Sequence, residues 1–341
     1  MENHFAGCGN PRWSGPPFGV TMARQSTGAT VTKLSTLKPF AAGDIFLGCT
    51  YLCDPDDDHA GDGRILQFTR DLVPKGTLYT AGTTHLVVNL RFGPDGTLWA
   101  FDPFAHAVVR VSPDGAQLPA GDFGDRGWGS VAFAGDGSFV LCEYLCGDQP
   151  YQGGAMRCLP GTDVVGYGRL VKFTADGQKV GEFDNDLAPS RTGFHGVTHC
   201  AMHPDGRTLT YMTDLGARVM RFDVQDGQQL PDIFQVPENE LAERLWTTGV
   251  DYLRDGTLLL LRGRRIDCID GNGTDTRQIE LDDYGYAMIT VAPDEAHVLV
   301  TNIFTGVMSR LDLASGTITG QIDTGMAKPC RSLAGVAEFP G

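Results

Sequence analysis

Histidine, arginine and tyrosine recur at a fixed distance from a turn that the chain repeats. The turn aspartates, each between two apolar runs, are Asp95, Asp136, Asp205, Asp255 and Asp294. Ten residues before them stand His85, Arg126, His195, Leu245 and Tyr284, and Arg331 falls at about the same level in the last apolar run. Histidine and arginine are seldom buried without partners. Their convergence on one axis therefore predicts a site for a metal ion or an anionic molecule.

A divalent metal is the first interpretation of the two histidines in this ring. We expect His85 and His195 to share zinc, with iron, manganese or calcium as alternatives. The third ligand would come from His106 or from His59. His199 lies four residues beyond His195, about 13 Å along a strand, so we expect it to bind substrate instead. The alternative is that both ring histidines only hydrogen-bond to neighbouring strands.

The other ring residues suggest catalytic roles. We expect Tyr284 to act as an acid or base, and Arg126 or Arg331 to hold a carboxylate or a similar group. The register could slip by one residue, so Trp128, Trp246 and Tyr286 are alternative lining residues that would contact the substrate.

Short β-type segments around Pro-Asp-Gly turns must position these residues. Residues 85–115 hold three apolar runs and two such turns, and Asp-Gly between apolar runs is a strong hairpin signal. The turns recur at a period of roughly 40 residues, which is typical of a β-propeller. We predict an all-β, six-bladed propeller over residues 43–341, closed by pairing of the C-terminal strand (332–339) with the N-terminal strands. Residues 1–42 are expected to be an extended or poorly ordered arm.

Two long insertions indicate which end of the propeller carries the site. Both follow a Cys-x-Tyr-Leu-Cys segment, at Cys49–Cys53 and at Cys142–Cys146, and both fall between the second and third strands of a repeat. The opposite end carries the tight Asp-Gly turns. Because binding groups are commonly carried on loops that rigid strands hold in place, we expect the site at the channel mouth on the loop-rich face.

Composition narrows the partners. The formal net charge of −15 disfavours nucleic acid and anionic membranes. The sequence has no apolar run long enough to span a bilayer and no secretory signal pattern. Nine cysteines without a compact framework spacing predict mainly reduced thiols and a cytoplasmic location. A small-molecule substrate is the expected partner, and the oligomeric state is left open.

The repeat resembles that of six-bladed propellers of the NHL and SMP-30-like superfamily. The resemblance rests on PDGTLWAFDPFAHAVVRVSPDG and PDGRTLTYMTDLGARVMRFDVQDG, and it specifies architecture better than activity. The superfamily includes calcium lactonases, streptogramin lyases and the peptidyl-hydroxyglycine lyase. Its lyases use inner-strand histidine with arginine and tyrosine nearby. The resemblance therefore implies that His85, His195, Tyr284 and Arg331 form such a set.

These observations lead to one preferred function and two alternatives. The preferred hypothesis is a metal-assisted lyase or hydrolase of a small oxygenated, anionic molecule. The first alternative is a non-catalytic NHL-like propeller that binds a peptide or protein on its loop-rich face. The second is a calcium-dependent lactonase of the SMP-30 type.

Overall fold

The computed structural model describes residues 33–52, 61–144, 157–189, 196–325 and 333–341. The chain divides into two units, Met1–Lys33 and Leu34–Gly341. Every strand described below belongs to the second unit. In the described residues no helix is long and apolar enough to cross a membrane.

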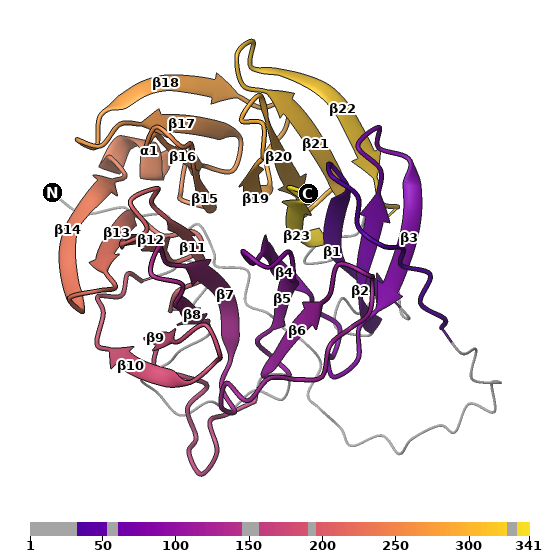
Figure 1. Cartoon of the computed structure of the whole chain (residues 1–341). Helices are drawn as coiled ribbons and strands as arrows, with labels where there is room; N and C mark the ends of the chain where they lie inside the picture. Colours follow the sequence, from indigo (N-terminus) through magenta and orange to yellow (C-terminus); the bar gives the residue numbers. More distant parts are fainter. Residues whose placement is uncertain (1–32, 53–60, 145–156, 190–195, 326–332) are drawn as a thin grey trace, which may run out of the picture. The chain divides into compact units, whose positions relative to one another are not determined.

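Four sheets of four antiparallel strands make up most of this unit (Figure 1). The first comprises β7 (Trp128–Phe133), β8 (Phe139–Glu143), β9 (Leu170–Phe173) and β10 (Lys179–Phe183). The second comprises β11 (His199–Met202), β12 (Thr208–Met212), β13 (Arg218–Asp223) and β14 (Gln228–Gln235). The third comprises β15 (Gly249–Tyr252), β16 (Leu258–Leu261), β17 (Arg265–Ile269) and β18 (Asp275–Glu280). The fourth comprises β19 (Tyr286–Val291), β20 (His297–Asn302), β21 (Val307–Asp312) and β22 (Thr317–Asp323).

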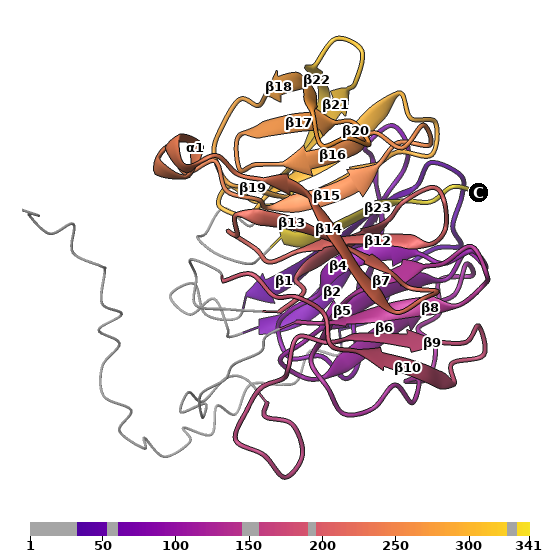
Figure 2. The same ribbon diagram turned by 90° about the vertical axis from the view of Figure 1, so that its left-hand side faces the viewer.

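A fifth sheet has seven strands in the order β3-β2-β1-β23-β4-β5-β6. Its strands are β1 (Ile45–Leu52), β2 (Gly61–Phe68), β3 (Pro74–Tyr79), β4 (Val88–Phe92), β5 (Leu98–Asp102), β6 (Ala107–Val111) and β23 (Leu333–Glu338). The short helix α1 (Glu238–Ala242) lies in the connection between β14 and β15, beyond one end of the strands (Figure 2). The unit is therefore an all-β propeller, as the repeat predicts.

The repeated turn has one structure in all five places. Each turn aspartate accepts a hydrogen bond from the backbone N–H two residues later, as between Asp95 and Thr97 at 3.0 Å and between Asp294 and Ala296 at 2.9 Å. The residue between them has a left-handed backbone, with φ of 77° at Gly96 and 55° at Glu295. Aspartate favours such turns because its side chain can bond its own backbone two residues on. The turn thus fixes the hairpin of the first two strands in each repeat.

The first strands of the sheets surround the centre of the unit (Figure 1). Contacts join β4 to β7, β7 to β11, β11 to β15, β15 to β19, β19 to β23 and β23 to β4. These six are called the inner strands below. Each of the first five runs from a long connection to a turn aspartate. Their first residues therefore lie at the same end of the unit as α1, which precedes β15.

The C-terminal strand pairs with the N-terminal ones, as expected. β23 is antiparallel to β1, with Ile45 opposite Glu338 and Leu47 opposite Val336. Its link to β4 is a single parallel bridge between Ala334 and Val88. This bridge joins β23-β1-β2-β3 and β4-β5-β6 into one seven-stranded sheet. The hydrogen-bonded sheets in the described residues therefore number five rather than the expected six.

Residues 34–42, which the sequence assigned to the N-terminal arm, belong to the same unit as the strands. Phe40 donates its backbone N–H to the carbonyl of Pro113 at 2.8 Å. Its ring packs edge-on against Phe46, Phe92 and Phe339. The β pattern of this segment is too weak to predict a strand, but one aromatic anchor is enough to bury part of it against the sheets.

Candidate functional site

The inner strands enclose a polar cavity of about 30 Å³. All six inner strands contribute to its lining: Asn89, Leu90, Arg91, Ser130, Val131, His199, Cys200, Val250, Met288, Ile289, Thr290 and Val336. A cavity of this size holds one or two water molecules when polar partners are present. The cavity is therefore too small to enclose a substrate, and it lies between the six inner strands.

An ion pair crosses the channel at this level. Nη1 of Arg91 on β4 donates to both carboxylate oxygens of Asp251 on β15, at 3.1 and 3.2 Å. Asp251 Oδ2 also accepts the backbone N–H of Val291 at 2.8 Å. Burial favours the neutral guanidine, but the neighbouring carboxylate outweighs it and raises the pKa of Arg91. The pair thus joins three inner strands and leaves the cavity without net charge from these two groups.

His199 is the titratable lining residue at the loop-rich end of its strand. It is the first residue of β11, and burial lowers its pKa to about 4. Its Nδ1 lies 2.9 Å from the hydroxyl oxygen of Thr198, and its Nε2 lies 3.2 Å from the sulfur of Met288. At neutral pH the imidazole is therefore uncharged, and one of its nitrogens faces only a weak acceptor.

Asn89 holds three inner strands in place at the same level. Its backbone is left-handed, with φ of 49°, and the pairing of β4 with β5 shifts register between Val88 and Arg91. Its amide nitrogen donates to the carbonyls of Gly129 and Thr198, each at 2.8 Å. Asparagine tolerates this backbone better than most residues. The irregularity in β4 turns an amide toward the axis, where it bridges neighbouring sheets.

The described members of the ring predicted ten residues before the turn aspartates lie outside the inner strands: His85, Arg126, Leu245 and Tyr284. These strands have only four to six residues. A position ten residues upstream is therefore in the connection that leads into each strand. Positions six residues upstream carry Asn89, Ser130, His199 and Met288, all of which line the cavity. Counting from the turn aspartates reaches the cavity lining when the offset matches the length of the inner strands.

The sequence suggested that Arg126 holds a substrate carboxylate, but its guanidinium is bound to carboxylates of the protein. Its Nε and Nη2 donate to the two oxygens of Glu143 at 3.0 and 2.9 Å, and its Nη1 donates to Glu182 at 2.9 Å. Its guanidinium also stacks 5.0 Å from the ring of Trp128. Glu143 in turn accepts the backbone N–H groups of Tyr167 and Arg169. This arginine therefore holds a loop junction together.

The predicted histidine ligands do not gather among the described residues. His106 has Nδ1 at 2.8 Å from Asp125 and Nε2 at 3.1 Å from the carbonyl of Arg157, so both of its nitrogens have structural contacts. His85 is buried, with its ring edge-on to Phe104. No group of three or more metal-binding side chains occurs in the part of the chain that is described. His59, His195 and Arg331 lie outside the described residues.

The aromatic candidates are mostly structural. Trp128 is buried and donates its indole N–H to the carbonyl of Phe123 at 3.2 Å. Tyr286 is also buried, and its hydroxyl contacts Asp282 at 2.6 Å and Ser309 at 3.0 Å. These two side chains thus pack between strands and do not line the cavity.

Two aromatic candidates remain near the loop-rich end. Tyr284 lies two residues before β19 and stacks on Phe304, with ring centroids 6.3 Å apart. Burial raises the pKa of the Tyr284 hydroxyl. Trp246, three residues before β15, is partly buried. Both therefore precede an inner strand, in the connections at its loop-rich end.

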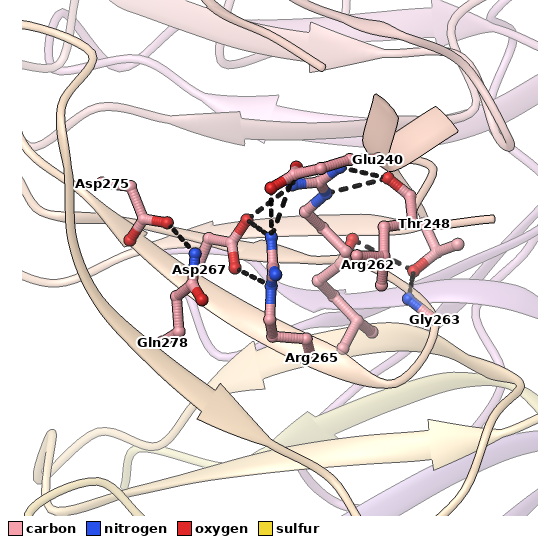
Figure 3. A network of polar contacts seen from close by, with 10 residues as sticks. Glu240, Thr248, Arg262, Gly263, Arg265, Asp267, Asp275 and Gln278 are labelled. Carbon is pink, nitrogen blue, oxygen red and sulfur yellow. Dashed lines mark hydrogen bonds and ion pairs between the residues drawn. The ribbon is translucent and has the colours of Figure 1, made fainter. Parts of the chain in front are cut away.

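A second buried ionic cluster anchors α1 (Figure 3). Arg262 is fully buried, and its Nη1 donates to Asp267 at 2.9 Å and to Glu240 of α1 at 2.5 Å. Arg265 donates to both oxygens of Asp267 at 2.5 and 3.0 Å. The carbonyl of Leu245, a position of the predicted ring, accepts Arg262 Nε at 3.0 Å. The two arginines and two carboxylates balance in charge, so this cluster positions the β14–β15 connection.

Comparison with known proteins shows the fold. No protein-family profile matches the chain, and no curated protein matches it in sequence. The structure is similar to one in a nidogen–laminin complex, with a TM-score of 0.57, 14% identity, and 86% of this chain and 97% of that chain covered. A gluconolactonase from Xanthomonas campestris gives a TM-score of 0.52, 16% identity, and coverage of 78% and 85%. A streptogramin B lyase gives 0.51, 16%, and coverage of 89% of each chain.

Proposed function

We propose that this propeller is a lyase or hydrolase that acts on a small oxygenated, anionic molecule at the loop-rich mouth of its channel. The neighbours of similar fold include a gluconolactonase and a streptogramin B lyase, which supports a propeller hydrolase or lyase in general terms. The observation that carries the proposal is the buried, neutral His199 in the lining of the cavity. Residues whose pKa is strongly perturbed beside a cavity are enriched at functional sites, which supports this assignment.

We further propose that the propeller has six blades. The seven-stranded sheet then consists of two of them, β23-β1-β2-β3 and β4-β5-β6. The support is that a single bridge joins these halves, whereas β1 and β23 pair over five residues. With six blades, each inner strand supplies one face of the cavity.

His199 and Tyr284 are proposed to move the protons. With Nδ1–H donating to Thr198, Nε2 of His199 carries a lone pair that accepts a proton from the substrate or from water. The thioether of Met288, 3.2 Å away, has no proton to donate to that lone pair, so the lone pair is left for a substrate group or water. Tyr284 has a raised pKa, so its hydroxyl stays protonated and acts as the acid.

The anionic substrate and the metal depend on residues outside the described part. Since Arg126 is bound to Glu143 and Glu182, Arg331 is the arginine proposed to bind the anionic group of the substrate. A divalent metal is proposed at His85 and His195, with zinc preferred. Metal analysis of untagged protein tests this, and loss of the ion in His85→Ala is the expected result. A metal-free native protein would overturn the proposal that His85 and His195 bind a metal, and it would leave the proposed role of His199 intact.

A recognition propeller is the second candidate, because one neighbour of similar fold comes from a complex between two proteins. Exposed Tyr51, Tyr167 and Phe304 favour it, since isolated aromatic side chains at loop ends suit protein contacts. The calcium lactonase has weaker support. Asp251, the carboxylate bordering the cavity, is already bound to Arg91. We propose a cytoplasmic location from the reduced cysteines.

The decisive experiment is turnover of a panel of small lactones, esters and eliminable oxygenated acids, followed by mass spectrometry. In His199→Gln we expect kcat to fall by a factor of roughly 100 or more on any substrate found. His203→Gln is the matched control, because His203 lies beside the turn at Asp205, at the other end of β11. Equal activity in both variants would overturn the role of His199. No turnover of any compound, together with saturable peptide binding, would favour the recognition propeller.

A further inference from the structure

A pair of cysteines from two different sheets meets beside the cavity. Cys142 lies on β8 and Cys200 on β11, and both are buried with free thiols. Ser130 on β7 is opposite Cys142 in the strand register. The Cys200 thiol donates to the Ser130 hydroxyl oxygen across the sheet boundary at 3.3 Å. One hydroxyl therefore connects the two cysteines.

The two cysteines also lie in one buried cluster and differ in acidity. A hydrogen bond with Cys142 lowers the pKa of Cys200, and Ser130 and the charge of Arg91 act in the same direction against burial. Burial and the hydrogen bond with Cys200 raise the pKa of Cys142. Cys200 lines the cavity and Cys142 does not, so Cys200 is the sulfur that meets a small oxidant first. Its lowered pKa favours the thiolate, which is the nucleophile in sulfur chemistry.

A small oxidant has room beside Cys200. Cys200, Ser130 and Arg91 all line the axial cavity, whose volume of about 30 Å³ accommodates a molecule of the size of water or hydrogen peroxide. The Arg91 side chain, which lines the cavity, is 29% exposed. Cys142 is completely buried and does not line the cavity. The pair thus has one accessible sulfur and one resolving sulfur.

We propose that Cys200 and Cys142 are a redox-active dithiol that hydrogen peroxide oxidises to a disulfide between β11 and β8. The Cys200 thiolate attacks one peroxide oxygen, the O–O bond breaks, and hydroxide leaves to give a sulfenic acid. The Cys142 sulfur then attacks that sulfenic sulfur. The S–S bond forms, the S–O bond breaks, and the hydroxyl leaves as water with the Cys142 proton. Two electrons from the thiols reduce one peroxide, and a thiol reductant restores both cysteines.

The disulfide would alter the lining of the cavity. Once its sulfur is bonded to Cys142, Cys200 loses its S–H donor to Ser130, a lining residue next to His199. The link would also tie two neighbouring sheets together at the level of the Arg91–Asp251 pair. This inference stands independently of the proposed enzymatic activity, because its readout is the oxidation state of the two sulfurs.

Peptide mapping of the full chain after titration with hydrogen peroxide tests the proposal. The expected result is a Cys142–Cys200 cross-linked peptide that a thiol reductant removes, with a loss of about 2 Da per chain. Cys200→Ser should lose the cross-link, and Cys142→Ser should accumulate a Cys200 sulfenic acid that dimedone captures. Cys268→Ser, in a sheet that contains neither cysteine, is the control and should retain the cross-link.

Three outcomes would overturn the dithiol: a disulfide that joins either cysteine to another residue, no cross-link at peroxide concentrations that oxidise Cys158, or unchanged cross-linking in Cys200→Ser. Circular dichroism of each variant shows whether it is folded. If a serine variant does not fold, the mapping of the unmodified chain decides the question by itself.

Discussion

Arg91 on β4 and Asp251 on β15 bind each other across the axis of the propeller, although 160 positions separate them in the chain. Nη1 of the arginine lies 3.1 and 3.2 Å from the two carboxylate oxygens. The Asp251 side chain is only 10% exposed. The pair therefore couples strands on different sides of the channel at the level of the cavity.

Breaking this pair should destabilise the propeller more than removing it whole. Asp251→Ala leaves the Arg91 charge without its partner, and we expect a loss of about 2–4 kcal/mol in the free energy of unfolding. The double variant Arg91→Met, Asp251→Leu should recover most of that loss. Denaturant unfolding measures both. Arg70→Ala, which breaks an exposed pair with Asp294, is the control and should change stability by less than about 1 kcal/mol.

His199 should make stability depend on pH in the acidic range. Its folded pKa of about 4 lies below the ordinary value of 6.5, so between these values the unfolded state binds a proton that the folded state does not. Stability therefore falls as the pH drops from 6.5 to 4, by about 3 kcal/mol for this group. In His199→Gln this contribution should disappear. A parallel pH dependence of unfolding in the two proteins would show that the imidazole is not held neutral.

Arg126→Ala should act on stability through the loop junction that it holds. The change leaves the fully buried carboxylate of Glu143 with the backbone N–H groups of Tyr167 and Arg169 but without the charge of Arg126. We expect a loss of about 2–4 kcal/mol and a lower melting temperature. Loss of substrate affinity with unchanged melting would instead restore its predicted substrate role.

The anchoring of α1 can be tested at Glu240. Glu240→Gln weakens its ion pairs with Arg262 and Arg265 while Asp267 remains in place (Figure 3). We expect faster hydrogen exchange in residues 238–246 and a loss of about 1–2 kcal/mol. Glu243→Gln, at the exposed end of the same helix, should leave both quantities unchanged. Equal exchange rates in the two variants would show that the cluster does not hold the helix.

Deleting residues 333–341 should prevent folding of the propeller. These residues include β23, which pairs along β1 and carries Val336 into the cavity lining. Without it, β1 and β4 both present open edges. Deletion of Pro340 and Gly341 alone, which follow the strand, is the control. A melting transition of unchanged temperature in the longer deletion would contradict the role of β23 in closing the unit.

The sequence alone determined the repeat, the turns and the pairing of the chain ends, because these follow from local chemistry. An aspartate that bonds its own backbone, a left-handed residue after it and alternating apolar runs specify a hairpin wherever they occur. The candidate site was placed less well. Its level along the axis depends on how many residues each inner strand contains, and the sequence does not mark where a strand begins in a long connection.

Only the tertiary structure decided which side chains meet. Asn89 faces the axis because of an irregularity in β4. Arg91 is neutralised by Asp251, which belongs to another sheet. Arg126, just before β7, is bound by Glu143 of the same repeat. Cys142 and Cys200 share Ser130 because their two sheets lie next to each other around the axis. Partners from different sheets carry no spacing signal in the chain, since closure of the sheets around an axis brings together residues that local pattern treats as unrelated.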